Sequence, residues 1–217
     1  MKKREMMMLM AVITLLSIAT LPTFAQPAEP HNANAMWIEP STIDLRDKPV
    51  GYRFNVTVWV NVSIGLNYVG GWQFVIVYEK EFLNVTRVGY TAGDKSEFFH
   101  NITTMPVDPD LGSWNATHNY VQHGESWLMG DMRRPGYGSL SWIEFEVIKT
   151  PEAEYVSKMS LVTTGIRHSY VIDEDGIEVD LNPYAAEYII PEFTSMYILI
   201  LTASTLIAIF IIKRKTR

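Results

Sequence analysis

Apolar and polar residues alternate along several short stretches of the chain. Arg53–Ser63 places five apolar residues on one face and Asn, Thr, Trp, Asn and Ser on the other, and Ser139–Ile148 has a similar alternation. Trp72–Tyr78 carries aromatic and aliphatic residues on one face, but its second face is also apolar at Val75 and Val77. A period of two predicts β-strands, and a strand apolar on both faces is expected to be covered on both.

Further strand signals recur about every ten residues, separated by turn-forming residues. An edge strand is expected where Pro40 interrupts an apolar run, because proline cannot donate to a sheet ladder. The long segment Lys95–Ser126 has a weak pattern with three breaking residues, and it predicts a loop with at most a short strand. The remaining predicted strands are Met36–Leu45, Phe82–Tyr90, Trp127–Met132, Ser157–Thr164 and Ser169–Leu181, the last bent into a hairpin at residues 173–176. Eight or nine short strands predict an all-β sandwich over residues 36–181.

The carboxy-terminal run Thr194–Ile212 contains no charged residue and is followed by the basic tail 213–217. As a helix it would be roughly 28 Å long, about the thickness of a bilayer's hydrocarbon core. The alternative is a buried core helix, but uninterrupted apolar length with a basic stop favours a transmembrane anchor. Residues 182–193 are then a short tether between the domain and the membrane.

The amino terminus has a basic start, an apolar segment and small residues at Thr23 and Ala25. This layout predicts a signal peptide over residues 1–25, with an uncleaved second anchor as the alternative, and a flexible leader over residues 26–35. Because a basic tail stays in the cytoplasm, we expect a single-pass type I protein of the cell membrane with its domain outside the cell.

The net charge and the cysteine content exclude or disfavour several classes of function. The chain carries −6, of which the amino-terminal segment contributes +2 and the tail +4, so the exterior portion carries −12. A strongly acidic domain disfavours nucleic acid as a partner. The absence of Cys excludes disulfides and thiol catalysis, so packing must supply the stability.

Five Asn-X-Ser/Thr sequons lie in the exterior portion. Their agreement with the exported location favours glycosylation at some of them, although Asn-Val-Thr is also what a strand with a polar face looks like. An occupied asparagine must face solvent. The candidate sites are Asn55, Asn61, Asn84, Asn101 and Asn115.

Four segments resemble cohesin-type domains. Gly71–Tyr78 and Phe82–Thr86 resemble the third and fourth strands of that family, Gly138–Val147 is similar to its Gly-x-Leu-x-x-Ile-x-Phe-x-Val strand, and Val171–Ile177 is similar to its closing hairpin. The resemblance spans about Met36–Leu181. It implies a nine-stranded jelly-roll β-sandwich, related to carbohydrate-binding modules, with a dockerin-like helical partner.

The chain departs from the family pattern at Glu79-Lys80, where Asp-Pro is usual, and in the longer Lys95–Ser126 segment. Pro191-Glu192-Phe193 before the anchor resembles tails of archaeal surface proteins, which suggests an archaeal-type cell.

Two binding modes are compatible with the pattern. In the first, the sheet face that carries Val75 and Val77 docks another surface protein, in adhesion or scaffolding. In the second, the outward aromatic residues Trp59 and Trp142 stack on a polysaccharide. The alternative for these tryptophans is packing beneath a loop or a glycan.

Catalysis lacks a recognisable constellation. Asp108 and Asp110 lie in a proline-rich segment and are typical of solvated turn residues. His118 and His123, near Glu125, are the one metal-like grouping, but their spacing of five favours surface histidines. Ca²⁺ binding through Asp173 and Asp175 is compatible with the turn, although the spaced ligands of an EF-hand are absent. We therefore expect a binding protein without catalytic or metal-ligating residues.

Overall fold

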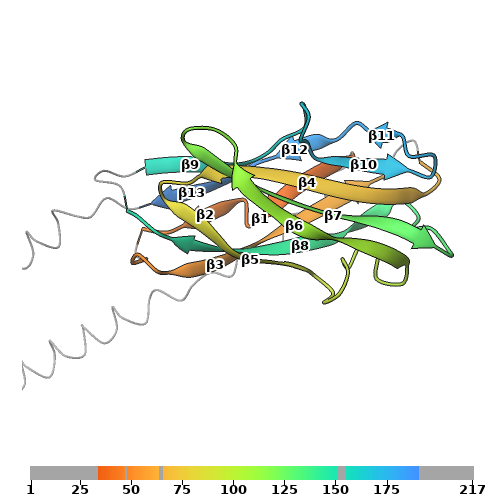
Figure 1. Cartoon of the computed structure of the whole chain (residues 1–217), viewed down its shortest axis with the longest axis horizontal. Coiled ribbons are helices and arrows are strands. Elements are labelled where there is room, and N and C mark those ends of the chain that lie inside the picture. Colours follow the sequence, from red (N-terminus) through yellow and green to blue (C-terminus); the bar gives the residue numbers. More distant parts are fainter. Residues whose placement is uncertain (1–33, 47, 64–65, 151–154, 191–217) are drawn as a thin grey trace, which may run out of the picture.

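The computed structural model describes residues 34–46, 48–63, 66–150 and 155–190, which form a two-layered β-sandwich (Figure 1). Within these ranges there is no helix of the length and apolarity needed to cross a membrane. The predicted signal peptide, the transmembrane helix and the basic tail lie outside the described residues, as does most of the predicted leader.

The first layer is a five-stranded sheet at whose centre β3 pairs with β1 and β8. All contacts in this sheet are antiparallel except the parallel pairing of β12 with β1. Its strands, in spatial order, are β12 (Asn182–Tyr184), β1 (Ala35–Glu39), β3 (Arg53–Val62), β8 (Gly136–Val147) and β5 (Leu83–Tyr90).

The second layer is an eight-stranded sheet built around β4. One edge of β4 pairs with β7, which in turn pairs with β6, and the other edge is shared between β10 and β9. Its strands are β6 (Thr103–Ser113), β7 (His118–Met129), β4 (Val69–Glu79), β9 (Tyr155–Leu161), β10 (Tyr170–Asp173), β11 (Glu178–Val179), β13 (Ala186–Ile190) and β2 (Thr42–Asp44).

The core lies between the layers and follows the alternation in the sequence. The inward positions of β3 from Val56 to Val62 are at most 1% exposed, and those of β8 from Ile143 to Val147 are fully buried. Burying one such side chain contributes about 1.5–3 kcal/mol, so these rows fix which face of each strand points inward. The all-β sandwich expected from the sequence is confirmed.

The described residues contain thirteen strands where eight or nine were expected. The first expected strand is divided into β1 and β2, the expected tether contains β12 and β13, and most of the expected loop forms β6 and β7. Pro40 separates β1 in the first sheet from β2 in the second, and only β2 lies at a sheet edge. The parallel partners of these strands, β12 and β13, are separated in the same way. Residues 182–190 thus contribute a strand to each sheet, where a tether was expected, and Ala35 begins a strand instead of ending a leader.

The prediction of a loop over Lys95–Ser126 is wrong. Most of this segment forms the long β6–β7 hairpin, which lies along β4 (Figure 1). Three properties hide the hairpin from pattern analysis. The outer strand β6 contains Pro106 and Pro109, is exposed along nearly its whole length, and carries a register irregularity between Val107 and Asp110.

Candidate functional site

The outer face of the second sheet carries a small apolar cluster beside the main core. Val75 and Val77 on β4 contact Tyr120 on β7, and Val162, just after β9, packs against them. Val75 is completely buried, and Val77 and Tyr120 are 8% and 7% exposed. The second apolar face of β4 is therefore covered as expected, but the chain itself provides the cover.

A polar layer lies over this cluster and links three strands with the β9–β10 connection. Arg167 forms an ion pair with Asp110 on β6 and donates a hydrogen bond to Gln122 Oε1 on β7 at 3.2 Å. Gln122 donates to Gln73 Oε1 on β4 at 2.8 Å, and Gln73 Nε2 donates to the His168 carbonyl at 2.9 Å. Side chains about 50 to 95 residues apart in sequence thus hold one another in fixed positions.

Tyr120 joins the apolar and polar layers. The Arg167 guanidinium lies 4.7 Å from the centre of the Tyr120 ring, and the hydroxyl donates to Asp110 Oδ2 at 3.0 Å. Gly112 on β6 makes room for the ring, since a Cβ there would lie 2.8 Å from Tyr120 Cε1. The hydrogen bond and charge of Arg167, together with the Tyr120 hydroxyl, lower the pKa of Asp110, while desolvation raises the pKa of Tyr120.

Exposed apolar side chains adjoin this layer. Trp114, in the β6–β7 turn, is 39% exposed and packs edge-on against Tyr120 with ring centroids 6.3 Å apart. Ile166, next to Arg167, is fully exposed. We call the surface formed by Asp110, Gln122, Arg167, Trp114 and Ile166 the docking face. Val75 and Val77 support it from below and are not themselves available to a partner.

The predicted aromatic residues occupy the outer face of the other sheet. Trp59 is partly exposed and stacks with Trp37 on β1 and Tyr137 on β8. Trp142 is also partly exposed but lies against β5, where a Cβ at Gly89 would be 2.6 Å from Trp142 Cζ2. Trp142 lies opposite Thr57 in the β3–β8 ladder, and the ring that stacks with Trp59 on this strand is Tyr137, which is 57% exposed.

The histidine prediction is wrong for His123, which is 2% exposed and lies between the sheets. Its Nδ1 is 2.9 Å from the hydroxyl of buried Ser141, so a substrate cannot reach this Ser–His contact. Glu125 is also buried and accepts hydrogen bonds from the Ser96 amide and the Thr104 hydroxyl. These residues are structural. His123 and Glu125 are buried because they occupy inward-facing positions of β7. The sequence pattern did not predict this, because polar residues at inward positions interrupt the apolar alternation.

The acidic turn at residues 173–176 is closed by its own hydrogen bonds. Asp173 Oδ1 accepts hydrogen bonds from the Asp175 and Ile177 amides at 2.9 and 2.7 Å, which closes the β10–β11 turn. The Glu174 carboxylate accepts hydrogen bonds from the Asn67 side-chain amide and from the Tyr68 backbone amide. In the part of the chain that the structure describes, no group of three His, Cys, Asp or Glu residues could hold a metal ion. Asp110 belongs to the docking face.

None of the five sequon asparagines is buried. Asn61 on β3 is half-buried and the other four are exposed, so a glycan on any of those four would project into solvent. Asn115 Oδ1 accepts hydrogen bonds from the Thr117 and His118 amides in the β6–β7 turn.

Comparison with known proteins gives structural neighbours only. No family model and no curated protein matches the chain. A cohesin from a Clostridium thermocellum cohesin–dockerin complex superposes with a TM-score of 0.51 at 8% identity, covering 76% of this chain and 98% of the neighbour. A non-cellulosomal cohesin from the archaeon Archaeoglobus fulgidus gives a TM-score of 0.46 at 16% identity, covering 72% and 90%. The described domain therefore has the cohesin-type jelly-roll fold.

Proposed function

We propose that this chain is a non-catalytic binding module whose docking face binds another protein. The observation that carries the proposal is the combination of a fixed ionic layer with exposed aromatic and aliphatic side chains beside it. Interfaces are typically enriched in tryptophan and arginine, and pre-positioned side chains lose little entropy on binding. Here the Arg167 contacts with Asp110, Gln122 and Tyr120 already fix the arginine before a partner arrives.

A dockerin-like module is the partner class that we propose. The support is the shared fold with the C. thermocellum cohesin, which is described in complex with a dockerin. The charges on this face are one carboxylate and one guanidinium, so a partner must complement both signs.

We further propose that the domain is displayed outside an archaeal-type cell by a single carboxy-terminal membrane helix. The support is the sequence pattern of residues 1–25, 194–212 and 213–217. Brief protease treatment of intact cells tests this topology. Digestion of the domain in intact cells supports it, and protection until the cells are lysed would contradict it.

The docking proposal is tested with the full chain, purified in detergent and immobilised. Secreted proteins of the source organism are passed over wild type, over Arg167→Ala and over Arg53→Ala, and the affinity of any captured protein is then measured. Arg53 is the matched control, because it also forms ion pairs with carboxylates, Glu144 and Glu146, but on the opposite sheet.

We expect Arg167→Ala to weaken binding at least about tenfold and Arg53→Ala to leave it unchanged. Absence of a saturable protein partner, or equal loss in both variants, would refute the docking face.

A further inference from the structure

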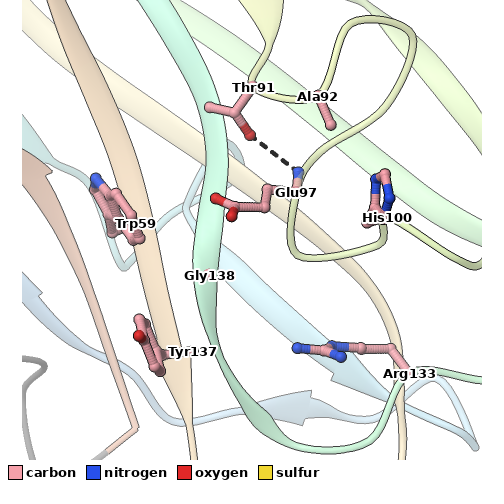
Figure 2. A pocket seen from close by; sticks show the side chains of 8 residues that line it. All are labelled: Trp59, Thr91, Ala92, Glu97, His100, Arg133, Tyr137 and Gly138. Atoms are coloured by element: carbon pink, nitrogen blue, oxygen red, sulfur yellow. Dashed lines mark hydrogen bonds between the residues drawn. The ribbon is translucent and has the colours of Figure 1, made fainter.

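A groove of about 650 Å³ lies on the opposite side of the molecule from the docking face, between the outer face of β3–β8 and the loop that follows β5 (Figure 2). Its volume is in the range typical of small-ligand sites. Trp59 and Tyr137 line one side, and Glu97, His100 and Arg133 contribute polar groups on the other.

The aromatic side is a row of stacked rings. Trp59 lies 6.3 Å from Trp37 with an interplanar angle of 17°, and 6.4 Å from Tyr137 with an angle of 22°. Trp59 is opposite Ser139 in the β3–β8 ladder, so Tyr137 is its diagonal neighbour on the same face. Trp37 is buried and supports the row, whereas Tyr137 is 57% exposed. The exposed end therefore presents flat apolar ring surface to the groove.

The polar side offers groups of opposite sign that do not pair with each other. The backbone amide of Glu97 donates to Thr91 Oγ1 at 3.0 Å, as Figure 2 shows, and one carboxylate oxygen accepts from Ser139. Within the described ranges the second carboxylate oxygen has no hydrogen-bond partner. It remains available as an acceptor.

Arg133 is positioned by an aromatic ring and not by a carboxylate. Its guanidinium lies 5.1 Å from the centre of the buried Phe98 ring, and among the described residues no acid lies within ion-pair distance of it. In Figure 2 the guanidinium points toward the side of the groove where Tyr137 lies. The terminal nitrogens are therefore donors for a ligand.

We propose that this groove binds a neutral pyranose unit of a glycan. A pyranose ring has an apolar face of C–H groups that can stack on Trp59 and Tyr137, and hydroxyls at its rim that both donate and accept. Glu97 would accept from these hydroxyls and Arg133 would donate to them. One charge of each sign in the groove, within an exterior portion of net charge −12, favours a neutral ligand over an anionic one.

Two sources supply this chemistry: a polysaccharide outside the cell, or an N-linked glycan of the chain itself. Asn61 is directly opposite Tyr137 in the β3–β8 ladder and is part of a sequon. A glycan on Asn61 would begin beside the aromatic row. The experiment therefore compares chain produced in a host that adds no N-glycans with chain glycosylated at Asn61.

The probes are neutral oligomers of glucose, mannose, galactose and N-acetylglucosamine, added to the full chain in detergent and followed by tryptophan fluorescence and calorimetry. Tyr137→Ala and Glu97→Gln are the test variants, because both side chains are exposed and their loss is compatible with folding. Trp114→Ala, an exposed aromatic on the docking face, is the matched control.

We expect the unglycosylated chain to bind at least one oligomer, with affinity reduced roughly tenfold in Tyr137→Ala and unchanged in Trp114→Ala. Binding by both forms of the wild-type chain identifies an external polysaccharide. Binding only by the unglycosylated form identifies the chain's own glycan as the occupant. No binding of any oligomer at millimolar concentration, or equal effects of Tyr137→Ala and Trp114→Ala, would overturn the proposal, and neither result bears on the Arg167 docking test.

Discussion

Acidification from pH 7 to pH 4 should destabilise this domain through one buried imidazole. The His123 ring lies between the sheets against Tyr90, Trp72 and Phe74, with ring centroids 4.3, 6.0 and 6.1 Å away. Desolvation lowers its pKa to about 4, and a backbone hydrogen bond at Val107 offsets this only in part. The native state therefore holds His123 neutral at pH values where an unfolded chain protonates it.

The direction and the size of this change in the free energy of unfolding follow from proton linkage. A histidine in the unfolded chain has a pKa near 6.5, so above that pH both states are neutral and the full stability is present. Between pH 6.5 and 4 the unfolded state binds a proton that the native state does not, and the free energy of unfolding falls as the pH falls. At about 1.4 kcal/mol per pH unit over about 2.5 units, reduced by about 0.4 kcal/mol because native His123 is itself half protonated at pH 4, the loss is about 3 kcal/mol, a large part of a typical stability of 5–15 kcal/mol.

Urea unfolding of the full chain in detergent, followed by tryptophan fluorescence at half-unit steps from pH 7 to 4, measures this loss. Carboxylates also titrate near pH 4, so the informative quantity is the difference between wild type and His123→Gln. Gln122→Ala is the matched control, because Gln122 is the next residue of β7 and faces outward. The wild-type curve should fall about 3 kcal/mol more than that of His123→Gln, and Gln122→Ala should keep the wild-type slope. Parallel curves for wild type and His123→Gln would refute the reasoning.

Two further predictions test the packing. A methyl group at Gly70 would collide with the Asp173 carbonyl oxygen, so Gly70→Ala should lower the free energy of unfolding by about 1–3 kcal/mol in urea titrations. Gly136→Ala, whose Cβ would be 3.6 Å from its nearest neighbour, should change it by less than about 1 kcal/mol, and equal effects would contradict the clash. A chain cut after Tyr184 keeps β12 but lacks β13 and should lose its cooperative unfolding transition in calorimetry, whereas a chain cut after Ile190 should retain it. A cooperative transition in the shorter chain would show that β13 is dispensable.

The sequence identified the strands that have one apolar face and one polar face. In β3 and β8 the inward rows alternate cleanly, and the acidic turn at residues 173–176 forms the predicted hairpin. The β6–β7 hairpin escaped prediction because β6 is an exposed edge strand with two prolines. The inward row of β7 also contains His123 and Glu125, whose burial depends on partners elsewhere in the chain.

For the site residues too, the sequence predicted what depends on one strand alone and missed what depends on contacts between distant segments. The apolar second face of β4 correctly indicated that Val75 and Val77 are covered. What covers them is Tyr120, Val162 and the layer around Arg167, and nothing near β4 in the sequence encodes those contacts. Likewise, strand alternation placed Trp59 on an outer face. The stacking of Trp59 with Tyr137 depends on the register of β3 against β8, which alternation does not specify.

The buried polar groups explain how the docking face is held in place. The Tyr90 hydroxyl accepts a hydrogen bond from the Val107 amide at 2.9 Å and donates to the Gly124 carbonyl at 2.7 Å, so it joins β5 to both strands of the β6–β7 hairpin. Val107 begins the register irregularity of β6, and Asp110 ends it opposite Gln122. A buried tyrosine thus fixes the local shape of an edge strand that few apolar contacts hold. Because that shape brings Asp110 to Arg167, the ionic layer on the surface depends on a hydrogen bond made between the sheets.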